Sequence, residues 1–417
     1  MDNQIKNRID NCFSWSSDPA NSYGAPALME KENYWDDIDL NDDDDIEALM
    51  ELAMRSMRMG SEPNADFVKY LVSKGFDINA KLPGKNCLLL QAADYRLSPD
   101  IFRQLIEIGA DIYAENSAGD NALLLSARRP CKPKDEETDG ALAIYIAENY
   151  DLSLLDKTDR FGITPLMYAA LENHIILAKT LIEHGSDVNA AGTEPIGGNS
   201  YWLKMNGVTP LALACRCGNT EIAKILLEAG ADETLCDAKG NPPIFSLLRY
   251  PFNFFQNSRF NDPIFNRKCE ILSMLKETEL TDSKGYTVLL RSLCDSEDHF
   301  DKGGAYDNLP ITLALLERGV NIEATGNDGK RPLHLAVLGL GDAHKKLVKL
   351  GAELNVQDNE GNTPLLAVLK RGSEKNARYL IKSGADISLQ NNRGDTAMSL
   401  AAERGFSDVL ELLMENG

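Results

Sequence analysis

The sequence predicts an all-α solenoid, in which short helix–turn–helix repeats stack side by side, and three observations support this prediction. A motif of glycine, any residue, threonine, proline and leucine recurs with small variations, and a Gly-Ala-Asp-like triplet follows each clear copy. The anchor glycines recur at a base interval near 33 residues. Between motif and triplet, apolar residues follow the spacing of amphipathic helices. The clear copies begin at Gly162, Gly207, Gly329 and Gly361, and weaker ones at Gly84, Gly119, Gly240, Gly285 and Gly394.

The first element of each repeat is expected to be a short helix that starts at the proline of the motif. Proline fits the first turn of a helix, where its missing N–H is not needed, and threonine before it is a good N-cap. Thr164-Pro165 and Thr209-Pro210 stand in this order. Small residues follow, as in 211–215, so that neighbouring helices can approach closely.

The second element is an amphipathic helix that ends at a glycine. In one copy, Ile222, Ile225 and Leu226 form the apolar face. Gly230 stands just past the end of this helix, where a left-handed backbone conformation is favourable. A single helix pair cannot bury its own apolar face, so the repeats must stack to build a common core.

The combination of Thr-Pro-Leu with Gly-Ala-Asp at this spacing resembles the ankyrin repeat. The resemblance covers about ten repeats in residues 45–417, several of them degenerate, and leaves residues 1–44 as an acidic, mostly irregular N-terminal arm. It implies helix pairs joined by short β-turn fingers. It also implies protein–protein recognition on a rigid concave surface of fingers and first helices, as a scaffold without catalysis.

Insertions interrupt the repeats at four places. Successive anchor glycines from Gly84 to Gly394 are 35, 43, 45, 33, 45, 44, 32 and 33 residues apart. The longer intervals indicate extra residues near 128–139, 191–206, 249–268 and 294–308. Insertions in a solenoid form loops and often carry binding.

Two of these insertions carry aromatic residues. Tyr201 and Trp202 fall in an expected finger, where they either anchor a partner or, for Trp202, fold back onto the adjacent helix. The stretch 249–268 combines six aromatic residues with four bases and one acid. It is either a partner site or a hydrophobic cluster packed under a long loop.

These considerations define a set of candidate partner-binding residues. From the first helices and the insertions, the set is Tyr168, Tyr201, Trp202, Arg249, Tyr250, Phe252, Phe254, Phe255, Arg259, Phe260 and Arg291. The first-helix positions expected to face the concave groove are Leu125, Tyr168, Leu213, Ser246, Arg291, Leu335 and Ala367.

The charge of the chain disfavours some partner classes. The net charge of the 417 residues is −21, and the segment Glu30–Glu51 alone carries −10. So acidic a surface repels nucleic acid and anionic lipid. The longest apolar run, Ala141–Ala147, has seven residues, whereas a membrane-spanning helix needs about 20. We therefore expect neither nucleic-acid binding nor membrane insertion.

The chain lacks the common catalytic and metal-binding motifs. It has no HExxH, no phosphate-binding loop with Gly-Lys-Ser/Thr and no GxSxG. His334 occupies a position whose ring, by the resemblance, bonds the backbone of a neighbouring loop. The pair Cys215 and Cys217 is weak for zinc, and we interpret both residues as core thiols. No catalytic, cofactor-binding or metal-binding residue is therefore expected.

The function predicted is that of a monomeric protein-binding scaffold. Eight scattered cysteines without a CxxC pair are typical of reduced thiols in the cytoplasm. The alternative is a secreted bacterial effector acting in host cytosol, or an enzyme-associated inhibitor, whose N-terminal arm or long insertions carry a cryptic activity. The residues outside the repeats are too few for an ordinary catalytic domain, which favours the scaffold.

Overall fold

The computed structural model describes residues 38–58, 65–84, 86–128, 140–193, 206–249, 263–294, 308–339 and 341–416. The chain divides into two compact units, an N-terminal unit of residues 1–205 and a C-terminal unit of residues 206–417. Each unit is described by itself. In the described ranges the regular elements are helices, and the only β-type pairing is at two isolated bridges, Thr281 with Thr287 and Gln390 with Thr396.

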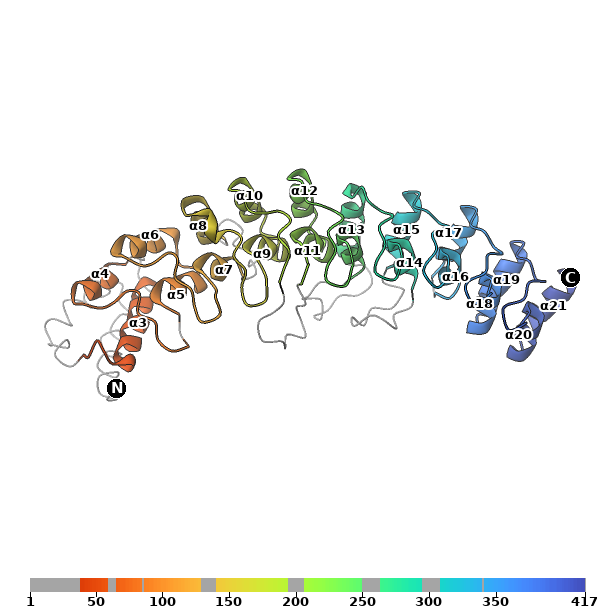
Figure 1. Ribbon diagram of the computed structural model, residues 1–417, viewed down its shortest axis with the longest axis horizontal. Coiled ribbons are helices and arrows are strands. Elements are labelled where there is room, and N and C mark those ends of the chain that lie inside the picture. The colour runs from red at the N-terminus through yellow and green to blue at the C-terminus, as the bar shows by residue number, and fades with distance from the viewer. Residues whose placement is uncertain are drawn as a thin grey trace. The chain divides into compact units, whose positions relative to one another are not determined.

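The N-terminal unit contains four helix pairs within its described residues (Figure 1). The first helices pack in succession, as do the second helices. The helices are α3 (Asp43–Arg58), α4 (Asp66–Ser73), α5 (Leu88–Asp94), α6 (Pro99–Ile108), α7 (Ala122–Ala127), α8 (Ala141–Asn149), α9 (Pro165–Glu172) and α10 (Ile175–Glu183), with a 3-10 turn η3 (Leu152–Leu154) after α8.

The C-terminal unit contains six helix pairs within its described residues. Its first helices α14, α16, α18 and α20 pack in succession, and the second helices form a parallel row (Figure 1). The helices are α11 (Pro210–Cys217), α12 (Thr220–Glu228), the 3-10 helix η4 (Pro243–Leu248), α13 (Pro263–Met274), α14 (Val288–Leu293), α15 (Leu309–Glu317), α16 (Pro332–Ala336), α17 (Ala343–Lys349), α18 (Pro364–Arg371), α19 (Glu374–Lys382), α20 (Ala397–Arg404) and α21 (Ser407–Asn416).

The predicted helix boundaries are confirmed at the motif. Thr164 and Thr209 are N-caps, and their hydroxyls accept hydrogen bonds from the N–H groups of the third helical residues at 3.2 and 3.3 Å. Gly230 has φ of +88°, as expected just past a helix end. The core is aliphatic, and Leu211 in α11 is 1% exposed. The all-α repeat architecture is therefore built as the sequence indicates.

One first helix differs from the others. Residues Pro243–Leu248 form the 3-10 helix η4, which begins with two adjacent prolines, Pro242 as the N-cap and Pro243 as the first residue. Carbonyl groups at the end of η4 accept hydrogen bonds from a side chain of the second helix of the same pair. The side chain of Lys268 in α13 is buried, and its Nζ donates to the carbonyls of Leu247, at 3.0 Å, and Arg249.

The described part of the acidic segment includes the turn that precedes α3. Asp42 Oδ1 accepts hydrogen bonds from the backbone N–H groups of Asp44 and Asp45 at 3.0 and 3.1 Å, and acids in the first turn complement the helix dipole. No helix in the described part of the chain is both long and apolar enough to cross a membrane.

Candidate interaction surface at the finger loops

The turn before each first helix is here called a finger loop, and six of these loops are closed by an acidic or amide side chain three residues before the anchor glycine. Asp282 Oδ1 accepts hydrogen bonds from the N–H groups of Lys284 and Tyr286 at 2.9 and 3.0 Å. Side chains of this kind stabilise turns by replacing a backbone acceptor. The same arrangement occurs at Asn116, Asp159, Asp237, Asp358 and Asn391.

In several finger loops, the second oxygen of this carboxylate is bound by a side chain within or directly after the following helix. The three described members of the predicted partner-binding set all do this. Tyr168 donates its hydroxyl to Asp159 at 2.6 Å, Arg249 pairs with Asp237 at 3.4 Å, and the Nε–H of Arg291 donates to Asp282 at 2.9 Å. Their immediate role in the structure is therefore to hold the base of the fingers.

Tyr168 is not a surface residue. Its side chain is 5% exposed, and burial, together with the neighbouring charge of Asp159, raises the pKa of its hydroxyl. The expected groove positions Leu125, Leu213 and Leu335 are buried as well. The reason is geometric: the first helices pack against one another, so these positions face the next helix rather than a groove. Only Ser246, Arg291 and Ala367 of that set remain partly exposed.

Most of the predicted aromatic anchors lie outside the described residues. These are Tyr201, Trp202, Tyr250, Phe252, Phe254, Phe255, Arg259 and Phe260. Their role in partner binding stays a prediction.

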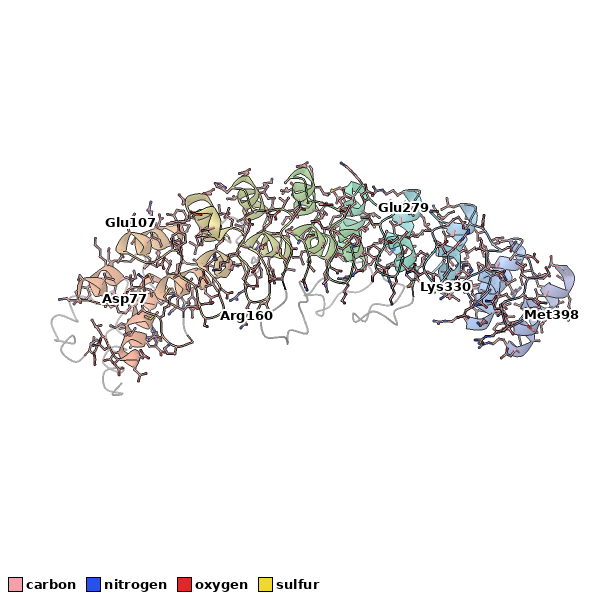
Figure 2. All side chains as sticks on the ribbon, viewed as in Figure 1. Asp77, Glu107, Arg160, Glu279, Lys330 and Met398 are labelled. Carbon is pink, nitrogen blue, oxygen red and sulfur yellow. The ribbon has the colours of Figure 1, made fainter. Side chains whose placement is uncertain are left out.

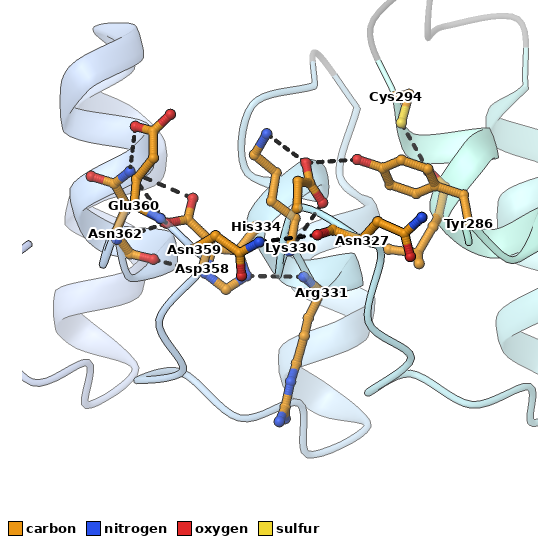
Figure 3. Close-up of polar contacts among 12 residues, drawn as sticks. Tyr286, Cys294, Asn327, Lys330, Arg331, His334, Asp358, Asn359, Glu360 and Asn362 are labelled. Carbon is orange, nitrogen blue, oxygen red and sulfur yellow. Dashed lines mark hydrogen bonds and ion pairs between the residues drawn. The ribbon is translucent and has the colours of Figure 1, made fainter. Parts of the chain in front are cut away.

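In the C-terminal unit the finger loops are tied to one another by a ladder of asparagines, of which Figure 3 shows Asn327 and Asn359. The side-chain amide of Asn359 donates to the carbonyl oxygen of Asn327 at 3.0 Å, and that of Asn392 donates to the carbonyl of Asn359 at 3.0 Å. Backbone hydrogen bonds also link these fingers. The N–H of Asn359 donates to the backbone carbonyl of Asp328 at 3.1 Å, and the N–H of Asn392 donates to the backbone carbonyl of Glu360 at 3.0 Å. Three successive fingers are thereby locked together.

Two anchor glycines of these fingers leave no room for a Cβ atom, and their backbone conformation also favours glycine. A Cβ added at Gly329 would lie 2.3 Å from Oδ1 of Asn359, and one added at Gly361 would lie 2.5 Å from Oδ1 of Asn392. Both glycines also have positive φ, +79° and +77°. The close approach of each finger to the next therefore depends on the absence of a side chain.

A second network joins the finger loops that precede α14 and α16. Here Tyr286 and Lys330 meet the same carboxylate, that of Asp328 (Figure 3). The Tyr286 hydroxyl donates to Asp328 Oδ2 at 2.7 Å, and Lys330 Nζ donates to it at 2.8 Å. Burial alone would raise the pKa of Asp328, but the hydrogen bonds from Lys330 and Tyr286 outweigh it and lower that pKa. The guanidinium of Arg291 lies 5.0 Å from the centre of the Tyr286 ring, within the range of a cation–π contact.

His334 has the structural role expected for it. Its Nε2 donates to the carbonyl of Asn362 in the next finger at 3.0 Å, and its Nδ1 accepts from the N–H of Arg331 at 3.2 Å. This pair of bonds requires the neutral ring. Burial lowers the pKa of His334 and so favours the same state.

The described residues offer little for catalysis or metal binding. Among them, no group of three or more His, Cys, Asp or Glu side chains is arranged to hold a metal ion. Burial raises the pKa of Cys215 to about 12, and a thiol that stays protonated is a poor nucleophile.

Sequence reasoning did not identify the asparagine ladder. Asn327, Asn359 and Asn392 each stand two residues before an anchor glycine. That recurrence was a usable signal, but an asparagine before a glycine is also common in any turn. The contact between fingers becomes visible only when their spacing is known.

Comparison with known proteins agrees with the repeats predicted from the sequence. A family profile described as "Ankyrin repeats (3 copies)" matches residues 89–237 and 338–417, more than half of the chain. Inversin of Mus musculus is 29% identical over 238 residues, which is 54% of this chain and 19% of that protein. Rabankyrin-5 of Mus musculus is 28% identical over 222 residues, 52% of this chain and 17% of that protein.

Two further proteins resemble the chain. Palmitoyltransferase AKR1 of Lachancea kluyveri is 28% identical over 228 residues, 54% of this chain and 27% of that protein. The chain thus spans less than a third of the length of each of these curated relatives. The crystal structure of the ankyrin repeat domain of Bcl-3 is 23% identical, with a TM-score of 0.47, and the match covers 61% of this chain and 99% of that one.

Proposed function

Because the chain belongs to the ankyrin-repeat family, whose repeats serve as protein–protein interaction modules, we propose that it is a scaffold that binds a protein partner along the finger loops of its C-terminal unit. The proposal narrows the predicted contact surface, which comprised fingers, first helices and insertions, to the fingers. The first helices are mostly buried against one another, whereas the tips of the fingers are exposed.

The observation that carries this proposal is the asparagine ladder. Loops that are held by hydrogen bonds lose little conformational entropy when they are immobilised in a complex. Asn327, Asn359 and Asn392 fix three neighbouring fingers in this way, while the tips of the same fingers remain open to solvent. A rigid row of exposed loops is the kind of surface that a folded protein can recognise without reordering it.

We propose binding without catalysis. One relative is named as a palmitoyltransferase, but this chain covers only 27% of that protein. The buried thiol of Cys215 and the neutral, structural ring of His334 give no support to a nucleophile–base pair at these residues. The effector or inhibitor alternative, the cytoplasmic location and the monomeric state stay predictions.

The proposal is tested by photo-crosslinking from defined positions. A photoreactive amino acid placed at Asn327 or Arg393 samples the fingers, and one placed at Lys349 or Lys382, both exposed on second helices, samples the other side. In cell lysate, we expect specific crosslinked proteins from the finger positions. Crosslinks that arise only from the second-helix positions, or from neither set, contradict the proposal.

A further inference from the structure

We propose that the finger loops of the C-terminal unit bind an acidic stretch of the partner protein through a basic strip formed by Lys239, Lys284 and Lys330. This inference rests on the proposed function, which gives the surface, and adds the chemistry of the partner. The three lysines stand at or next to the tips of three consecutive fingers, one residue before Gly240 and Gly285 and one residue after Gly329.

Charge is distributed unevenly between the two sides of the C-terminal unit. In its described finger loops and first helices (206–219, 236–249, 281–294, 326–339, 357–372 and 390–405), there are eleven Lys or Arg and seven Asp or Glu. In its described second helices and the turns after them (220–235, 263–280, 308–325, 341–356, 373–389 and 406–416), there are eleven Lys or Arg and sixteen Asp or Glu. The finger side is therefore positive in a chain of net charge −21.

The two sides are also separated in space. Lys330 lies on one edge of the C-terminal unit and Glu279, in the turn after α13, lies on the opposite edge (Figure 2). An acidic segment that approaches the finger side therefore meets the bases before it meets the acids of the second helices. Charges that are further apart than about 8 Å are largely screened at physiological ionic strength, so the local charge of the finger side decides the contact.

Two of the seven acids on the finger side, Asp282 and Asp358, are turned inward. The Asp282 side chain is 2% exposed, because its two oxygens are used by backbone N–H groups and by Arg291. Asp358 is likewise buried in its own turn. Lys239 and Lys284, by contrast, are exposed. A partner that approaches these fingers therefore meets the two exposed lysines, whereas Asp282 and Asp358 are covered.

The strip has defined ends and is partly preorganised. Lys330 is held by its ion pair with Asp328, which also accepts the hydroxyl of Tyr286. In the finger that precedes α18, the exposed acid Glu360 is bound by Lys370 at 3.3 Å. An acid at that tip limits the basic strip to the fingers that precede η4, α14 and α16.

An acidic protein segment fits this strip better than a nucleic acid does. A long polyanion would extend beyond the three fingers and meet the charge of the rest of the chain, which is strongly negative. A short run of aspartates and glutamates can be confined to the fingers. Surface charge pairs of this kind mainly control the rate of association and its salt dependence.

The experiment measures binding of a labelled oligoglutamate peptide to the full chain by fluorescence anisotropy, with the matched oligoglutamine peptide as a control for charge. The double variant Lys239→Gln with Lys284→Gln removes two charges from the strip. The double variant Lys349→Gln with Lys382→Gln removes the same charge from the second helices α17 and α19, where both residues are exposed. The strip variant should bind oligoglutamate about tenfold more weakly, and the control variant should bind it as the wild type does.

Three results overturn the inference: no binding of oligoglutamate by the wild type, an equal loss in both double variants, or tighter binding of duplex DNA than of oligoglutamate. The crosslinking experiment keeps the two proposals distinguishable. Crosslinks from the fingers together with absent oligoglutamate binding leave the scaffold function standing and remove the acidic partner. Absence of crosslinks from the fingers removes the proposed surface itself.

Discussion

The side-chain amide of Asn392 donates a hydrogen bond to the backbone carbonyl of Asn359, so a residue in the last finger loop is fixed by the finger before it. The same relationship joins Asn359 to Asn327 one helix pair earlier. Three loops are thereby coupled by side chains as well as by backbone hydrogen bonds. Rigid fingers are the physical basis of the recognition proposed for this chain.

Replacing Asn359, the middle residue of the ladder, should loosen two contacts with the preceding finger at once. Asn359→Ala deletes the amide that reaches Asn327, and it removes the side chain that lies against Gly329. A lost hydrogen bond of this kind costs about 1 kcal/mol. Amide hydrogen exchange should accelerate in the finger residues 326–331 and 357–362. Asn266→Ala, an exposed position on α13, is the control and should leave these rates unchanged.

Two glycines with the same backbone conformation should respond differently to alanine. Gly329 has φ of +79° and its Cβ would meet Asn359, whereas Gly351 has φ of +90° and has nothing within 4 Å of a Cβ. Both variants have the left-handed strain, but only Gly329→Ala has the clash. We expect Gly329→Ala to lose about 1–3 kcal/mol of unfolding free energy beyond the loss in Gly351→Ala. Equal urea midpoints for the two variants would show that the fingers are not in close contact.

The core of the repeats should show the usual cost of a cavity. Leu211 in α11 is 1% exposed, so Leu211→Ala should reduce the unfolding free energy by about 2–5 kcal/mol. Leu235 is 37% exposed in the turn after α12, and Leu235→Ala should have a much smaller effect. Denaturant unfolding followed by circular dichroism provides the measurement. A thermal or chemical transition that Leu211→Ala does not move would exclude this residue from the stack.

Stability should decrease when the pH falls below the ordinary pKa of histidine. Burial lowers the pKa values of His334 and His344 in the folded chain, although nearby acceptors act in the opposite direction. The unfolded chain then binds protons more readily than the folded chain. The histidine contribution to stability is therefore complete above about pH 6.5 and is lost as the pH drops through the lower folded-state values.

The contribution of one histidine can be separated from that of the carboxylates. Nε2 of His344 is buried and has no hydrogen-bond partner among the described residues, so protonation there adds an uncompensated charge. His344→Leu should therefore reduce the dependence of the unfolding free energy on pH between about 5 and 6.5. An unchanged slope in this variant would mean that His344 does not carry the effect.

The parts of this fold that depend on local rules could be predicted from the sequence. Thr164 and Thr209 cap their helices, and Gly230 adopts the left-handed conformation, because these preferences act within a few residues. The 3-10 form of η4 was not predicted. Its two adjacent prolines suit a helix start in general, and the buried Lys268 that completes it comes from another helix.

The surface was harder to predict because it depends on contacts between repeats. Tyr168 was expected in a groove, but the packing of successive first helices buries it, and its hydroxyl is bound by Asp159. Arg291 was singled out as a contact residue, yet it also holds Asp282. The packing of successive first helices, which buries Tyr168, is a property of the stack and not of any single repeat, whereas the contact of Arg291 with Asp282 lies within one repeat.

The central claim is that the fingers of the C-terminal unit contact the partner, and a hydrogen-exchange footprint with the crosslinked protein tests it most directly. The account predicts slower exchange in residues 281–287, 326–331 and 357–363 when the partner is bound. Slower exchange confined to the second helices α13, α15 and α17, with the fingers unchanged, would contradict it.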